Sequence, residues 1–117
     1  MGMFPKIRVL HYLFTKNERG KTIAHCLNFD IVTSADNLDE AERRLDVLMK
    51  SYLEDLLRGN GACAANNTAP QHFWEAYTNA LQHGGILPSR PLRISVPEMV
   101  PMEMPFGNLP VVAAQAA

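Results

Sequence analysis

The stretch that most constrains the fold is residues 22–58, which read TIAHCLNFDIVTSADNLDEAERRLDVLMKSYLEDLLR. Its first part contains two short runs of apolar and β-branched residues, which predict strands at 22–28 and 31–34. A polar break at Phe29-Asp30 separates the two runs, and the second leads directly into a helical pattern. The spacing leaves almost no loop, so these elements must pack on one another.

The helix in this stretch has a clear start and a clear apolar face. Asn37 precedes Glu40 by three residues, which is the spacing of a capping box. Apolar residues then recur every three or four positions, the period of a helix that buries one side. Arg58 and Gly59 mark its end. The central stripe comprises Ala41, Leu45, Leu48, Tyr52 and Leu56, and it is widened by Leu38, Met49, Leu53 and Leu57.

Weaker patterns flank this unit. Residues 7–15 predict a strand that pairs with 22–28 as a hairpin, and its two largely apolar faces predict that it lies inside the sheet or under a second layer. Residues 70–83 predict a second helix, and residues 91–96, between two prolines, an edge strand. Residues 97–117 form a Pro- and Met-rich extension that we expect to be irregular, with its last residues disordered. Thr68 and Gln71 suggest a second capping box.

These elements predict one α+β domain spanning residues 1–117, with its core in 7–58. The expected fold is a small antiparallel sheet of three or four strands with one main helix on one face. A second helix and the extension complete it. We expect a cytoplasmic protein, because no stretch has the roughly 18 apolar residues of a membrane span and two cysteines are too few for a disulfide framework. The net charge of −1 provides no basic field for general nucleic-acid binding.

Candidate chemistry is sparse, and we expect no enzyme, no cofactor and no metal site. His11 and His25 lie on the two arms of the predicted hairpin, but the unknown register leaves open whether they share a face. Zinc needs three or four ligands in recognisable spacings, and none is present. The carboxylates of the first helix alternate with Arg and Lys, which is typical of a solvated face.

Binding residues are predicted in two places. The second helix carries Phe73, Trp74, Tyr77 and Leu81 on one broad face; this spacing is more typical of a core or a subunit contact than of a platform for stacking bases. The extension is too apolar for a solvated tail, so we expect it to pack on its own domain or on a second subunit. The candidate partner-binding residues are Trp74, Met99, Met102, Met104 and Phe106.

The segment from Gly20 to Leu57 resembles the N-terminal domain of HicB-like antitoxins. That family has a glycine before its second strand, a bend, a short strand and a helix that opens Leu-x-Glu-Ala. The matching residues here are Gly20, Leu38, Glu40, Ala41, Leu45, Tyr52 and Leu53. The family's Pro-x-Leu-Pro-Gly bend is replaced by residues 26–30, which indicates a divergent member. The resemblance implies a sheet with one helix on one face, in a partly ferredoxin-like or double-stranded-RNA-binding-domain-like arrangement.

The same resemblance implies a function. We expect a non-enzymatic protein-interaction module that binds a protein partner, with a small toxin-like ribonuclease as the partner class, and that forms a homo-oligomer. The expected binding surface combines a sheet edge with the apolar C-terminal extension. HicB-like antitoxins usually carry a DNA-binding segment after this domain, and residues 59–117 show no such pattern. The alternative function is an RNA-binding module that uses the basic N-terminal hairpin, for which the expected signature is a steep dependence on salt.

Overall fold

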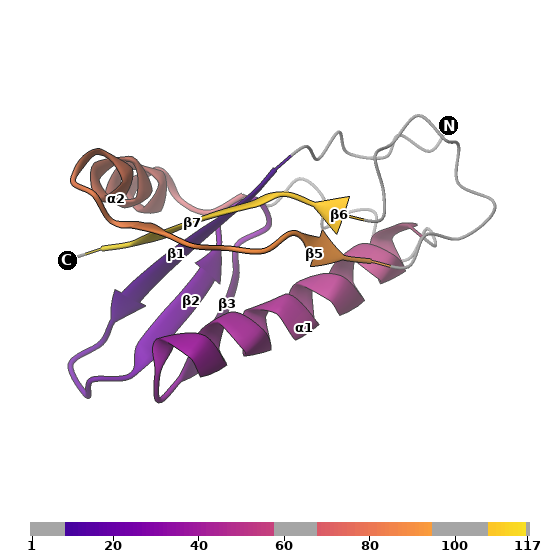
Figure 1. Ribbon diagram of the computed structural model, residues 1–117, viewed down its shortest axis with the longest axis horizontal. Coiled ribbons are helices and arrows are strands. Elements are labelled where there is room, and N and C mark those ends of the chain that lie inside the picture. The colour runs from indigo at the N-terminus through magenta and orange to yellow at the C-terminus, as the bar shows by residue number, and fades with distance from the viewer. Residues whose placement is uncertain (1–8, 58–67, 95–107, 117) are drawn as a thin grey trace.

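A computed structural model describes residues 9–57, 68–94 and 108–116. The chain has the predicted α+β architecture. The main sheet is mostly antiparallel and lies between two helices, with α1 along one face and α2 across the other (Figure 1). None of the helices in the described residues is long and apolar enough to cross a membrane. The elements, in chain order, are β1 (Leu10–Lys16), β2 (Thr22–Cys26), β3 (Ile31–Ala35), α1 (Leu38–Leu57), α2 (Gln71–Gln82), β4 (Ile86–Leu87), β5 (Leu92–Arg93), β6 (Asn108–Leu109) and β7 (Val111–Gln115).

The main sheet has the strand order β3-β2-β1-β7-β4. Strands β1, β2 and β3 form the antiparallel meander that the hydrophobic pattern predicts. The β1–β2 turn is stabilised by Asn17, whose Oδ1 accepts the backbone N–H groups of Arg19 and Lys21, both at 3.0 Å. Gly20 has a φ of 77° in this turn, a conformation that favours glycine.

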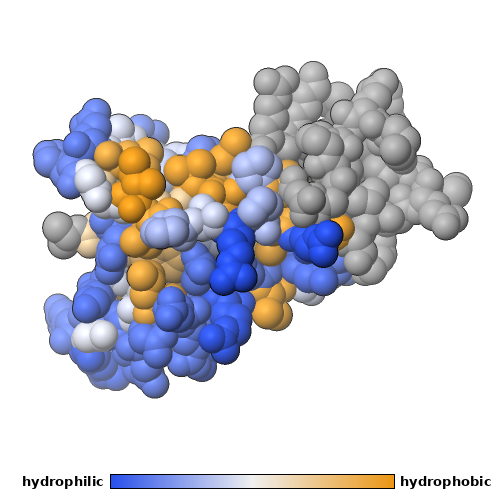
Figure 2. All heavy atoms as spheres, in the orientation of Figure 1, coloured by the Kyte–Doolittle hydropathy of each residue, from blue (hydrophilic) through white to orange (hydrophobic). Residues whose placement is uncertain are grey.

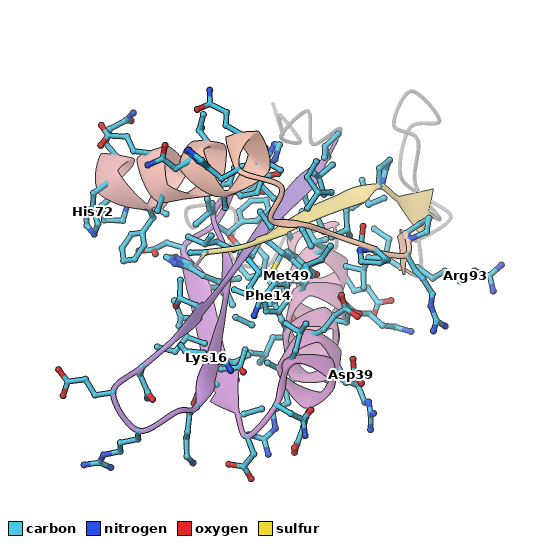
Figure 3. The ribbon with its side chains drawn as sticks, turned by 60° about the vertical axis from the view of Figure 1, so that its left-hand side comes forward. Phe14, Lys16, Asp39, Met49, His72 and Arg93 are labelled. Carbon is cyan, nitrogen blue, oxygen red and sulfur yellow. The ribbon has the colours of Figure 1, made fainter. Side chains whose placement is uncertain are left out.

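Helix α1 begins as predicted and packs on the meander. Asn37 Oδ1 accepts the N–H of Glu40 at 2.8 Å, which is one half of a capping box. The Glu40 carboxylate does not complete the box, because it accepts a hydrogen bond from Arg44 instead, at 2.9 Å. The core on this side of the sheet includes Phe14 and Met49, both fully buried between the strands and α1 (Figure 3).

Leu48 departs from the predicted stripe. It is 42% exposed, whereas the neighbouring Met49 is fully buried. Consecutive helical residues point about 100° apart, so only one of the two can face the sheet. Met49 continues the line of Ala41 and Leu45, four residues apart, and Leu48 is directed to one side.

The second face of the sheet carries a smaller core under α2. Leu13 and Ala114 from the strands pack there with Tyr77 and Ala80 of the helix. The second capping box is not formed, because Pro70 occupies the N-cap position without a side-chain hydrogen bond. Thr68 instead donates its hydroxyl to the carbonyl of Leu27 at 3.1 Å, which ties the start of α2 to the β2–β3 turn.

The end of the chain differs most from the prediction. Residues 111–115 are not a disordered tail; they form β7, which inserts beside β1 in parallel and separates it from β4. Ala113 and Ala114 are both fully buried, one toward each core. A strand covered on both faces needs small side chains where two layers approach closely, so a low intrinsic β-propensity is overridden by packing.

The predicted edge strand at 91–96 is also placed differently. Only Leu92–Arg93 is strand among its described residues, and it pairs with β6 in a separate two-stranded sheet rather than joining the main one. The predicted alternation is confirmed, since Leu92 and Ile94 are buried and Arg93 is exposed. The main-sheet position next to β1 is taken by β7, which leaves the segment around β5 to cover α1.

Candidate functional site at the β3 edge

Among the residues that the structure describes, strand β3 is an open edge of the main sheet. It pairs with β2 on one side, and its other side is the end of the strand order. Its five residues, IVTSA, include no charge and no proline. Edge strands in natural proteins are usually shielded by such residues or by being very short, because their free N–H and C=O groups can pair with another chain. Within the described residues no strand lies beside this edge, although Arg44 of α1 donates to one of its carbonyls, that of Ser34, so the edge is a candidate site for adding a strand.

Two exposed apolar side chains flank this edge, one on each face of the sheet. Val32 points to the α2 face, because it lies opposite His25, and it is 52% exposed. Leu48 lies on the α1 side. It is placed between Arg44 and Tyr52, four residues away in each direction, which puts all three on one side of the helix.

The contacts of Arg44 and Tyr52 show where that side of α1 lies. Arg44 Nη1 donates to the carbonyl of Ser34, near the end of β3, at 2.8 Å. The Tyr52 ring lies 4.9 Å from the ring of Phe29, just before β3 begins. Leu48 is therefore level with the middle of β3. We call the surface made by β3, Val32 and Leu48 the β3 edge site.

A carboxylate stands at each end of this site. Asp30 precedes β3 and accepts a hydrogen bond from His25, with Nε2 and Oδ1 2.7 Å apart. Asp36 follows β3 and lies 3.8 Å from Lys21 Nζ. Both basic partners come from the β2 side of β3, so the outer side of each carboxylate faces solvent.

The two strand histidines share the α2 face, which settles the register that the sequence left open. Leu13 is paired with His25, and His11 lies two residues before Leu13. His11 Nδ1 lies 3.1 Å from the Tyr77 hydroxyl, which itself donates to the carbonyl of Val112 at 3.1 Å. Burial lowers the pKa of His11. No group of three or more metal-binding side chains occurs in the described segments, and these histidines anchor α2 to the sheet.

The predicted partner-binding residues do not gather at the β3 edge site. Trp74 is half-buried on α2, with its ring against His11 at 5.3 Å and Tyr77 at 6.3 Å. Its Nε1 donates to Thr68 at 3.1 Å, so it is a packing residue of the second core rather than an open stacking surface. The other four candidates, Met99, Met102, Met104 and Phe106, lie outside the described residues.

A second feature lies on the opposite side of α1 and was not predicted. Asp39, Glu42 and Asp46 line a cleft of about 400 Å³ together with Tyr12 and Arg90, although the sequence pattern indicates a solvated face. The Tyr12 hydroxyl is buried and donates to Asp46 Oδ1 at 2.9 Å. Burial raises the pKa of both Glu42 and Asp46. The signal in the sequence was Tyr12 itself, since a buried phenol needs a hydrogen-bond partner.

The only described cysteine is not a reactive group. Cys26 is fully buried in β2, and burial raises the pKa of its thiol to about 12. The nucleophilic thiolate is therefore suppressed at neutral pH.

Comparison with known proteins finds no relative of this chain. No family model matches it, and no curated protein or solved structure matches it.

Proposed function

We propose that this chain is a non-enzymatic protein-interaction module, similar to the N-terminal domain of a HicB-like antitoxin, and that it binds a protein partner by strand addition at β3. The observation that carries the proposal is the edge of β3, which has no charged residue of its own and no strand beside it among the described residues, with the exposed Val32 and Leu48 next to it. In strand addition, main-chain hydrogen bonds supply affinity and the flanking side chains supply specificity.

The order of the elements also supports this function. The HicB-like resemblance implies a hairpin, a third short strand and then a capped helix, and β1, β2, β3 and α1 follow in that order. The partner class that the resemblance brings is a small toxin-like ribonuclease, which the module would inhibit by covering its active site. A single added strand of five residues makes a small interface. The partner is therefore expected to contact residues beside β3 as well.

The experiment compares two valine substitutions. Val32→Lys places a charge at the centre of the open edge, where an incoming strand would have to bury it. Val47→Lys is the matched control, because Val47 is 65% exposed and lies on α1, one residue before Leu48 but about 100° around the helix. Tagged full-length protein is expressed in its source cells, and co-purifying proteins are quantified by mass spectrometry.

We expect one protein to be recovered in near-equal amounts with wild type and Val47→Lys, and to be lost with Val32→Lys. The recovered protein should have ribonuclease activity that the wild-type chain inhibits. Equal recovery with both variants would exclude β3 as the binding edge. The thermal unfolding midpoint of each variant, measured in parallel, identifies any loss that comes from misfolding.

A further inference from the structure

The charges at the two ends of β3 constrain what can bind there. Asp30 and Asp36 bracket the five uncharged residues of the strand, and their side chains are 43% and 81% exposed. Arg44 is the nearest cation on α1, and its guanidinium is already shared between Glu40 and the carbonyl of Ser34. The Ser34 carbonyl is therefore not free, and an added strand must displace Arg44 there or pair with the remaining main-chain groups of β3, which lie between two acidic ends.

The pattern of pairs across the sheet extends this constraint to the incoming strand. Lys21 faces Asp36 in the continuation of the β2–β3 register, in which Thr22 lies opposite Ala35. An added strand would lie on the other side of Asp36. Opposite charges across neighbouring strands are favourable, and like charges directly opposite are unfavourable. A basic residue at that position of the added strand would place Asp36 between two cations.

A second copy of this chain fits the site poorly. Two β3 strands that pair antiparallel with full overlap are centred on Thr33, with Ile31 opposite Ala35 of the other copy. Asp30 lies in the turn before β3, with a φ of 56°, and Asp36 follows the strand directly, so this register brings the Asp30 turn of one copy close to Asp36 of the other at both ends of the pair. Two like-charged pairs in so short an interface oppose self-association through this edge.

Resting on the proposed function, we propose that the occupant of the β3 edge site is a strand of a different protein, with a basic residue at each end of a five-residue stretch and apolar residues in its middle. The basic residues pair with Asp30 and Asp36. One central side chain lies beside Val32 on the α2 face, and its neighbour packs under Leu48 on the α1 face, since side chains of a strand alternate. Basic strands of this kind are expected on the surface of an RNA-binding protein, including a ribonuclease.

Two peptides of seven residues test this inference directly. The first is acetyl-Arg-Thr-Val-Val-Val-Thr-Arg-amide, which has a basic residue at each end and apolar residues at the centre. The second has Glu in place of both Arg residues. Because the sequences are symmetric, each charge meets a carboxylate whether the strand binds parallel or antiparallel. Binding to the full-length protein is followed through the backbone amide chemical shifts of residues 31–35.

We expect the Arg peptide to shift these amides and to bind about tenfold more tightly than the Glu peptide at low salt. The preference should shrink at 0.5 M salt, a condition at which the Debye length is only about 4–5 Å. Asp36→Asn should reduce the preference, whereas Glu75→Gln, a matched change at an exposed acid on α2, should not.

Three outcomes would overturn the inference. Equal affinity for the two peptides would show that charge does not select the strand, even if Val32→Lys still abolishes partner capture and the proposed function stands. No shift of residues 31–35 with either peptide at millimolar concentration would remove the site as a strand acceptor. A dimer that Val32→Lys dissociates and Val47→Lys does not would assign the edge to a second copy.

Discussion

The two edges of the main sheet are built in opposite ways. β3 offers five residues without charge or proline, beside the exposed Leu48. β4 offers only two residues and runs directly into Pro88, and the Ser89 hydroxyl then donates to the carbonyl of Val111 on β7. The β4 edge is closed by its short length and by the chain that follows it. On β3 a side chain also occupies one carbonyl, because Arg44 donates to Ser34, but within the described residues the rest of this longer edge has no strand beside it.

The two sides of the sheet also differ in how they are assembled. The β3 side is formed by neighbours in sequence, with β2, β3 and α1 joined by short turns. The β7–β4 side brings the two ends of the domain together, with Leu10 opposite Val111. Apolar side chains gather on that side between α2 and α1, while polar ones cover the hairpin and the start of α1 (Figure 2). The first side is local, and the second depends on the complete fold.

Removing residues 108–117 should have the largest effect. This truncation takes away β7, a strand covered on both faces, and with it the pairing of both β1 and β4. We expect loss of the cooperative unfolding transition in circular dichroism, because both cores lose buried residues. A folded truncated protein with unchanged near-ultraviolet signal would show that the meander and α1 are stable without the β7–β4 side. The C-terminal segment therefore cannot be deleted to test binding alone.

Gly85→Ala should have the next largest effect. A Cβ on Gly85 would meet the backbone carbonyl oxygens of Gln115 and Ala80, the second at 2.8 Å. Both oxygens are main-chain atoms, and the backbone is fixed here by hydrogen bonds from the Gly85 N–H to the Ala80 carbonyl and from the Gln115 N–H to the Gly85 carbonyl, so the junction must shift. We expect a loss of about 2–3 kcal/mol, or roughly 10 °C in Tm.

The adjacent Gly84 is the matched control for this substitution. It has a φ of 80° with no atom within 4 Å of an added Cβ, so Gly84→Ala should cost only about 1 kcal/mol, from backbone strain alone. Thermal unfolding of the two variants separates two contributions to stability. Gly85→Ala reports the close packing at the β4 junction, and Gly84→Ala reports the cost of its backbone conformation. Equal losses would contradict the packing argument.

Asp46→Asn should stabilise the protein in a pH-dependent way. Burial raises the pKa of Asp46 in the fold, so its carboxyl favours the neutral form there. The protonated carboxyl therefore stabilises the fold below pH 3.8, the ordinary pKa of the group. This stabilisation is lost as the pH rises through the higher pKa that Asp46 has in the folded protein. Asn retains an acceptor for the Tyr12 hydroxyl without this loss. The gain over wild type should therefore be largest at neutral pH and should vanish toward pH 3 in urea unfolding.

Asp46→Ala provides the control for the hydrogen bond. It removes the same carboxyl but leaves the buried Tyr12 hydroxyl without its acceptor. We expect it to be less stable than Asp46→Asn by about 1 kcal/mol at every pH. A gain for Asp46→Asn that does not depend on pH would contradict the assignment to ionisation.

The smallest change in stability is expected when one exposed residue on each edge of the main sheet is replaced, and these two variants compare the edges directly. Val32 and Ile86 are the exposed apolar residues of β3 and β4, at 52% and 62%. Substitution of either by Lys should change the free energy of unfolding by no more than about 0.5 kcal/mol. Partner recovery should be lost with Val32→Lys and retained with Ile86→Lys. Loss with both variants would mean that the closed edge also takes part in binding.

The local elements could be predicted because their signals are local. The cap at Asn37, the apolar period of α1 and the hairpin of β1 and β2 depend on residues a few positions apart, and the structure places each where the pattern indicates. The β3 edge site was predicted only as an unspecified sheet edge. The periodicity of Leu48 predicts a buried residue, but Leu48 is exposed, because the sequence does not show where the sheet beneath the helix ends.

What the sequence by itself determined is the unit β1–β2–β3–α1, since short turns and strong periodicity leave one arrangement for neighbouring elements. Only the tertiary structure decided that Val111–Gln115 is an inner strand, that His11 and His25 face the same helix, and that Tyr12 meets Asp46. These contacts join residues far apart in the chain, and their stability comes from burial against layers that no local pattern specifies. Within the described residues the same packing leaves β3 as the longer of the two outer strands of the sheet, and it is this edge that we propose as the binding surface.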